Sequence, residues 1–179
     1  MKITFFAHST TTDNEAHNAT GWLQGELSAK GLEQAKALPG LITDDSFSVV
    51  FTSDLKRAID SSEIGFKATH PIRTDSRLRE ANYGDLDGTN KSFKKDMSKF
   101  INTPYPNGES YKDTEARMQS FLDEVYDEFP DGHIAIIGHE ATQLDLDVIC
   151  DGLSWEQAIA TNWRPAQKWQ PGWTYTYSK

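Results

Sequence analysis

Short apolar runs of strand type alternate along the chain with stretches of helical periodicity, and this alternation constrains the fold most. The strand-type runs are "ITFFAH" (3–8), "FSVVFTS" (47–53), "HIAIIGH" (133–139) and "GWTYTY" (172–177). Strands that alternate with helices are typical of layered α/β folds. We therefore predict a three-layer sandwich with a central, mostly parallel sheet flanked by helices, in which the last run forms an edge strand. The length of 179 residues indicates a single domain, 1–179.

Helical spacing of apolar residues marks the segments between these runs. In the first, 28–42, Ser28 is a suitable N-cap and Pro39 should disturb the last turn. Its predicted buried face consists of Leu32, Ala35, Leu38 and Leu41. Further helices are predicted from near Ser53, over 110–129 and over 140–153, and an extended segment over 72–80.

Composition and charge exclude several classes of partner. The formal charge is −9, from 18 basic and 27 acidic residues, so nucleic acid and anionic membranes are not expected to bind. A small anionic substrate stays compatible if a few arginines and histidines form a local cationic pocket. No apolar run is long enough to cross a bilayer, and the N-terminal run is too short for a signal peptide. The single cysteine, Cys150, excludes an internal disulfide, fits a reducing cytoplasm and is interpreted as a buried structural thiol.

Three predicted strands end in residues that can take part in catalysis or ligand binding: His8, Ser53 and His139. In α/β sheets, ligands collect beyond the carboxyl ends of the strands, so these ends should converge on one site. Either histidine alone would be interpreted as a structural residue, but two at equivalent strand ends indicate function. Arg57 lies about one helical turn beyond Ser53, near a helix N-terminus that favours an anion. The alternative for Arg57 is a solvated helix residue.

Five motifs along the chain resemble the histidine phosphatase superfamily, in its phosphoglycerate-mutase-like branch. They are "AHSTTTDN", "LSAKGLEQA", "FTSDLKRAIDSS", "LREANYGDLDG" and "IIGHEA", in the order and approximate spacing of that family. The resemblance covers nearly the whole chain. It implies an α/β fold and the hydrolysis of phosphate monoesters through a phosphohistidine, without a metal or a cofactor. The histidines also lack the compact spacing of metal ligands.

The resemblance assigns a role to four residues. His8 is implied to be the nucleophile that attacks phosphorus, and a neutral imidazole suits this task near pH 7. Arg57 and His139 would bind the phosphoryl oxygens and stabilise their charge in the transition state. Glu80 would protonate the leaving oxygen and then activate water. Without the resemblance, Glu80 would be interpreted as a solvated carboxylate.

Six further polar residues in or beside these motifs are predicted to contact the substrate, which we expect to be a small phosphorylated metabolite. They are Ser9, Thr11, Asn14, Ser53, Tyr83 and Glu140. His17 is interpreted as a surface loop residue that could also line the pocket. His70 and His133 flank predicted strands away from the site and are interpreted as structural.

Position 7 departs from the family pattern. The family signature has an arginine before the nucleophilic histidine, and this chain has Ala7. Loss of one preorganised donor costs about 3 kcal/mol, roughly a hundredfold or more in rate. One hypothesis is local compensation by the hydroxyls of residues 9–12, the Asn14 amide or Lys56. The other is a domain that binds phosphorylated ligands without turnover. A phosphoglycerate-type mutase is a third possibility, which the missing arginine disfavours because a mutase needs several cationic side chains.

Overall fold

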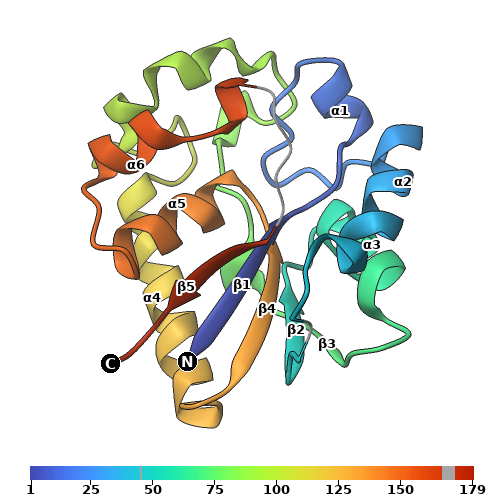
Figure 1. Ribbon diagram of the computed structural model, residues 1–179. Coiled ribbons are helices and arrows are strands. Elements are labelled where there is room, and N and C mark those ends of the chain that lie inside the picture. The colour runs from blue at the N-terminus through green and yellow to red at the C-terminus, as the bar shows by residue number, and fades with distance from the viewer. Residues whose placement is uncertain (45, 167–171) are drawn as a thin grey trace.

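Five strands form one sheet in a computed structural model that describes residues 1–44, 46–166 and 172–179 (Figure 1). The strand order is β3-β2-β4-β1-β5. The strands are β1 (Lys2–Ala7), β2 (Val49–Thr52), β3 (Ile72–Thr74), β4 (His133–Gly138) and β5 (Trp173–Thr176). The first four are parallel, and β5 pairs antiparallel with β1 at the edge of the sheet. The predicted mostly parallel sheet with a C-terminal edge strand is confirmed.

Helices cover both faces of this sheet, which gives the three predicted layers (Figure 1). On one face lie α2 (Ala29–Ala37) and α3 (Lys56–Phe66), and on the other α4 (Tyr111–Glu128) and α5 (Glu140–Ile149). Successive residues of β1 serve the two layers, because side chains alternate along a strand. Phe6 packs in the α2–α3 layer with Phe66, and Phe5 packs in the α4–α5 layer with Phe121.

A third apolar cluster lies above the carboxyl edge of the sheet. It joins α5 to α6 (Trp155–Thr161) and to η4 (Lys91–Phe100), a ten-residue run of 3-10 turns. Short elements complete this upper part: α1 (Thr12–Glu15), η3 (Gly84–Leu86) and η5 (Arg164–Ala166). Figure 1 shows η4 and α6 above the sheet and α1 beside them, so the upper elements surround the carboxyl ends of β1 and β4.

Several predicted boundaries and faces differ from the structure. α2 ends before Pro39, as expected, and a 3-10 turn η1 (Leu38–Leu41) follows. Leu32 and Leu41 are 42% and 49% exposed, because the stripe that packs inward is the narrower one around Ala35. The helix predicted from near Ser53 begins at Lys56, and the one predicted to reach 153 ends at Ile149.

The segment predicted to be extended over 72–80 is only partly so. β3 is extended, but η2 (Ser76–Leu78) is a 3-10 turn. The turn forms because the Asp75 carboxylate accepts a hydrogen bond from the backbone N–H of Arg77, at 2.8 Å. This turn follows the carboxyl end of β3 and leads into Glu80.

Candidate active site

The two strand-end histidines are adjacent at the carboxyl edge of the sheet. β1 and β4 pair in parallel with Ala7 opposite Gly138, so the residues that follow them leave the sheet side by side. The backbone N–H of His8 donates to the Gly138 carbonyl at 2.9 Å. The ring centroids of His8 and His139 are 5.1 Å apart. The two rings lie close together, as expected from the sequence. They do so because β1 and β4 pair in a register that ends both strands at the same level.

The His8 ring is held with one nitrogen available. Its Nδ1 lies 2.8 Å from the Ser9 carbonyl, which can only accept, so Nδ1 carries the proton. Nε2 forms no hydrogen bond within the described ranges and keeps its lone pair. Burial, assisted by the positive charge of Arg57, lowers the pKa of His8 to about 3. The ring is therefore a neutral imidazole at pH 7, with Nε2 able to act as a nucleophile.

His139 is fully buried and stands at the N-cap of α5. Its Nε2 is 2.7 Å from the hydroxyl of Ser53, a residue that ends β2 and so joins the third strand end to the site. Burial, with the charges of Arg57 and of the neighbouring His8, holds the pKa of His139 well below its usual range. The neutral ring has one N–H, and the Ser53 hydroxyl can complement either tautomer.

Arg57 is a buried cation in the first turn of α3. Its two terminal nitrogens each donate to a backbone carbonyl at 2.8 Å, one of Leu23 and one of Gly21. These bonds fix the plane of the guanidinium and leave further N–H groups of its five free to bind a ligand. The carboxylate of Glu80 lies close enough to interact with its charge.

Glu80 is clamped at the N-terminus of α5. Its Oε1 accepts from the backbone N–H groups of Ala81 and Ala141, both at 3.0 Å, and its Oε2 from that of Glu140 at 3.3 Å. Its own carbonyl accepts from the Trp22 indole at 2.8 Å. The carboxylate therefore has a fixed direction at the wall of the site.

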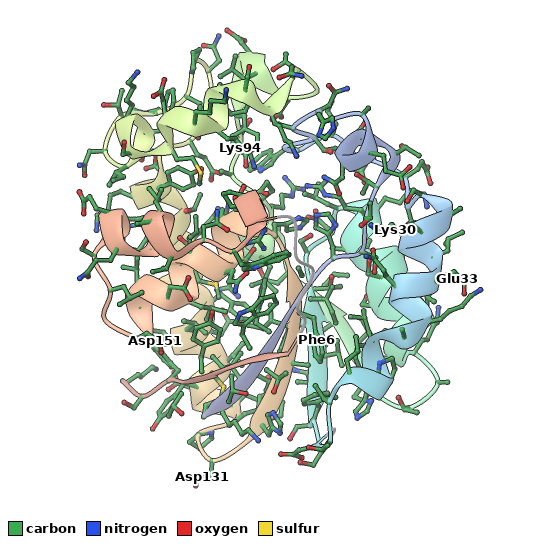
Figure 2. All side chains as sticks on the ribbon, turned by 45° about the horizontal axis from the view of Figure 1, so that its top comes forward. Phe6, Lys30, Glu33, Lys94, Asp131 and Asp151 are labelled. Atoms are coloured by element: carbon green, nitrogen blue, oxygen red, sulfur yellow. The ribbon has the colours of Figure 1, made fainter. Side chains whose placement is uncertain are left out.

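A cavity of about 650 Å³ opens between these residues and the upper elements, and His8, Arg57 and Glu80 line it. Its lining also contains four further cationic side chains: Lys91, Lys94, Lys95 and Arg164. Figure 2 labels Lys94 on η4, on the side that faces the interior. The cavity is therefore positively charged although the chain as a whole is acidic.

The six predicted substrate contacts divide into two groups. Asn14, Tyr83 and Glu140 line the cavity. The buried Tyr83 hydroxyl has no hydrogen-bond partner in the described part of the chain. The Glu140 carboxylate is already engaged, by the Lys94 ammonium at 2.5 Å and the Asn162 amide at 2.5 Å. Burial raises the pKa of Glu140, but the charges of Lys94 and Arg164 outweigh it, so the group stays ionised.

The other three belong to the frame of the site and do not line the cavity. The Ser53 hydroxyl is bonded to His139, and the Thr11 hydroxyl caps α1 by accepting the N–H of Asn14 at 3.0 Å. Ser9 is fully buried, and its backbone N–H donates to the Ser61 hydroxyl at 3.0 Å. The Ser53 and Thr11 hydroxyls and the Ser9 backbone thus position the His139 ring and the loop after β1, and do not form the surface that a substrate meets.

Lys56, which the sequence suggested as a local source of positive charge, is directed elsewhere. Its ammonium pairs with Asp60 at 2.5 Å and Glu26 at 3.2 Å, and it does not line the cavity. The sequence did not single out the four other cations of the cavity: Lys91, Lys94, Lys95 and Arg164. Their signals were a group of lysines, "NKSFKK", in an acidic chain, and an arginine in the tryptophan-rich stretch "NWRPA".

The remaining histidines and the cysteine do not alter this site. His17 is an exposed loop residue at the edge of the cavity. His133 lies at the opposite end of β4, where its Nε2 is 2.8 Å from the Thr4 hydroxyl, and His70 packs against Phe47. Cys150 is half-buried against the core, and burial raises the pKa of its thiol to about 12. It is therefore not a thiolate at neutral pH.

The described residues offer no metal-binding cluster and no membrane-spanning helix. Across residues 1–44, 46–166 and 172–179, no group of three or more His, Cys, Asp or Glu side chains is arranged to hold a metal ion. Over the same residues, no helix combines the length and the apolar character required to cross a membrane.

Proteins of known sequence that resemble this chain include phosphoglycerate mutases. A 2,3-bisphosphoglycerate-dependent phosphoglycerate mutase of Streptococcus agalactiae is 37% identical over 98 residues, which are 51% of this chain and 43% of that protein. The chain thus aligns with less than half the length of that relative. Phosphoglycerate mutase 2 of Gloeobacter violaceus, also 2,3-bisphosphoglycerate-dependent, is 30% identical over 165 residues, or 84% of this chain and 75% of that protein.

Solved structures with the same fold include phosphatases. A mycobacterial glucosyl-3-phosphoglycerate phosphatase in complex with VO3 has a TM-score of 0.77 and 25% identity, over 89% of this chain and 86% of its own. An Escherichia coli protein described as an alpha-ribazole-5'-P phosphatase has a TM-score of 0.75 and 22% identity. The match covers 88% of this chain and 83% of that protein. Residues 3–170 match the sequence profile of the Histidine phosphatase superfamily (branch 1). The chain therefore belongs to the histidine phosphatase superfamily.

Proposed function

We propose that this protein is a phosphatase that hydrolyses phosphate monoesters through a phosphohistidine on His8. The observation that carries the proposal is the arrangement of His8: a neutral ring with Nδ1–H held by a backbone carbonyl, Nε2 unpaired, and both His139 and Arg57 beside it. A phosphoryl group placed in the cavity would meet a nucleophile and hydrogen-bond donors together. This combination is what phosphoryl transfer requires, since positioning and charge stabilisation supply most of its catalysis.

In the first step, Nε2 of His8 attacks phosphorus and the bond from phosphorus to the ester oxygen breaks. The electron pair of that bond goes to the leaving oxygen, which takes a proton from the Glu80 carboxyl group. Arg57 donates hydrogen bonds to the phosphoryl oxygens, and the neutral His139 donates one further N–H to these negatively charged oxygens. The fixed direction of the Glu80 side chain at the cavity wall supports a role for it in proton transfer at the leaving oxygen.

In the second step, the Glu80 carboxylate takes a proton from water as the water oxygen attacks phosphorus. The bond between phosphorus and Nε2 breaks, inorganic phosphate leaves and His8 returns to its neutral form. Glu80 regains the proton that it gave to the leaving group, so the cycle closes without a metal or a cofactor. The substrate that fits this cavity is a small phosphorylated metabolite, and the single cysteine supports a cytoplasmic location.

The alanine at position 7 is the reason why two alternatives to a phosphatase are considered. It stands where the family signature has an arginine, and it is 5% exposed in the α4–α5 layer, so it offers no donor to the cavity. The curated relatives that are mutases favour a phosphoglycerate-type mutase as the second candidate. A domain that binds phosphorylated ligands without turnover is the third.

The test is turnover of a generic aryl phosphate between pH 4 and pH 8 by the wild-type protein and by His8→Ala. We expect turnover by the wild type, none by His8→Ala and normal turnover by the control His70→Ala, which alters a histidine outside the cavity. Phosphate release from the phosphoenzyme to water supports a phosphatase, whereas transfer to a phosphoglycerate acceptor supports a mutase. Absence of wild-type turnover across this pH range supports the binding domain and refutes the proposal.

A further inference from the structure

Arg164 lies at the opposite end of the chain from His8 but borders the same cavity. It begins η5, and its guanidinium reaches the His139 carbonyl with an Nη2–O distance of 3.4 Å. Its positive charge is one of the influences that lower the pKa of both His8 and His139, after burial and Arg57. A cation from the C-terminal part of the chain therefore stands beside both histidines.

Two of the six arginines, Arg57 and Arg164, differ from the others in having no ion pair with a carboxylate among the described residues. The other four bind carboxylates: Arg73, Arg77, Arg79 and Arg117. Arg57 and Arg164 have no carboxylate oxygen within ion-pair distance among the residues that the structure describes, and these two are the arginines that line the cavity. In a chain with 27 acidic residues, an arginine left without a carboxylate inside a cavity is available to an anion.

Its surroundings hold the Arg164 guanidinium in place without neutralising it. The group lies 4.7 Å from the centre of the Trp163 ring, and the Trp163 indole donates to Gln143 at 2.9 Å. Its hydrogen bonds to protein oxygens are long: 3.4 Å to the His139 carbonyl and 3.4 Å to the Asn162 side-chain oxygen. Such bonds are at the limit of the usual range, so a phosphoryl oxygen can compete for the donors.

Asn162 connects Arg164 to the buried Glu140. The Asn162 amide nitrogen donates to the Glu140 carboxylate at 2.5 Å, which directs its carbonyl oxygen toward Arg164. That oxygen also accepts the backbone N–H of Arg164 at 3.1 Å, and so fixes the start of η5. Glu140 is neutralised by Lys94 at 2.5 Å. The carboxylate thus orients Asn162 and interacts with the charge of Arg164, but it forms its direct ion pair with Lys94 and none with Arg164 among the described residues.

We propose that Arg164 is a phosphate-binding residue of this site, that it supplies from the C-terminal segment the guanidinium that position 7 lacks, and that Asn162 is its positioning residue. The planar fork of donors of Arg164 would bind the phosphoryl oxygens that Arg57 and His139 leave free. The inference rests on the proposed function for its catalytic consequence, but the binding of a phosphate-type anion does not depend on turnover.

Two measurements on matched variants test the inference. The first is kcat/KM for an aryl phosphate, where Arg164→Met should lose on the order of a hundredfold and Arg164→Lys, which keeps a charge, should lose less. Arg73→Met is the control, because Arg73 forms an exposed pair with Glu128 far from the cavity and should keep wild-type turnover. Added guanidinium ion should restore part of the turnover of Arg164→Met. Thermal unfolding establishes that each variant is folded.

The second measurement is calorimetric titration of the full-length chain with inorganic phosphate. Arg164→Met should bind it about tenfold to a hundredfold more weakly than the wild type, as expected for a lost charge-assisted bond. Asn162→Ala should weaken binding in the wild-type background but add little in Arg164→Met, because a positioning residue acts only through the group that it positions.

The outcomes separate this inference from the proposed function. Wild-type turnover that is unchanged in Arg164→Met, with unchanged phosphate affinity, overturns the role of Arg164 and leaves the phosphatase intact. Phosphate binding that requires Arg164 in a protein without turnover supports the inference and refutes the phosphatase. An Asn162→Ala effect of the same size in both backgrounds overturns the positioning role.

Discussion

The charge state of His8 can be tested through the pH dependence of stability. Its pKa is about 3 in the folded protein, against an ordinary value of 6.5, because of burial and the charge of Arg57. Between pH 7 and pH 4 the unfolded chain therefore takes up about three quarters of a proton at His8, while the folded protein takes up about a tenth of one. This protonation lowers the free energy of the unfolded state relative to that of the folded state. The stability that His8 contributes is therefore complete above pH 6.5 and is lost as the pH falls toward 3.

The linkage relation gives the size of the effect. Between pH 7 and pH 4 the free energy of unfolding should fall by about 3 kcal/mol on account of this group. The ring borders the cavity and is only partly buried, so we reduce this value to about 1.5 kcal/mol for screening by solvent. His8→Asn removes the titrating group and keeps a side-chain amide near the Ser9 carbonyl. The variant should therefore lose about 1.5 kcal/mol less than the wild type over this interval.

Urea unfolding at pH 7 and pH 4, followed by tryptophan fluorescence, measures the four free energies. Any cost of the substitution that does not depend on pH cancels in the difference between the two intervals. Titrating groups that His8 does not influence cancel as well, and His139 keeps the two largest causes of its pKa shift, burial and Arg57, in both proteins. Equal losses in the wild type and in His8→Asn would refute the reasoning, because they would mean that the folded protein protonates His8 as readily as the unfolded chain does.

Three further outcomes are expected. Ser53→Ala removes the hydroxyl that fixes the His139 ring and should lower kcat by about tenfold, whereas Ser62→Ala, a buried serine that does not line the cavity, should leave steady-state kinetics unchanged. Gly31→Ala would place a methyl carbon 1.9 Å from a backbone carbonyl oxygen of the loop after β1 and should cost about 2 kcal/mol or more by thermal unfolding, while Gly40→Ala, with nothing within 4 Å, should not. EDTA should leave the turnover of an aryl phosphate unchanged, and a loss restored by an added divalent cation would contradict the metal-free mechanism.

The convergence of His8 and His139 could be predicted because it follows from sheet topology. Each histidine is the residue immediately after a buried parallel strand, and adjacent parallel strands end at the same edge. Glu80 was not accessible to the same reasoning. It follows a 3-10 turn rather than a strand, and only the family resemblance singled it out from the charged residues around it.

Hydroxyl-bearing residues near the site could be identified from the sequence, but not the direction of each hydroxyl. Thr11 and Asn14 have the three-residue spacing of a capping box, and the structure uses them in that way. Their side chains thereby satisfy the backbone of α1, although Asn14 also reaches the cavity. Local hydrogen bonds of this kind compete with ligand binding for the same hydroxyl, and composition alone does not settle the competition.

The positive charge of the cavity shows why position 7 is a poor guide to the whole site. The binding of a phosphoryl group depends on the positions of the surrounding cations and not on their order in the sequence. The chain can supply these cations from any element that reaches the carboxyl edge of the sheet. The protein carries a formal charge of −9, and four of its six arginines are paired with carboxylates. The two that are not, Arg57 and Arg164, come from α3 and η5 and border the cavity that is lined by His8, whose ring lies beside that of His139. An acidic chain that leaves two guanidinium groups unpaired at the same place has the local field that an anionic substrate requires, although the residue before His8 is an alanine.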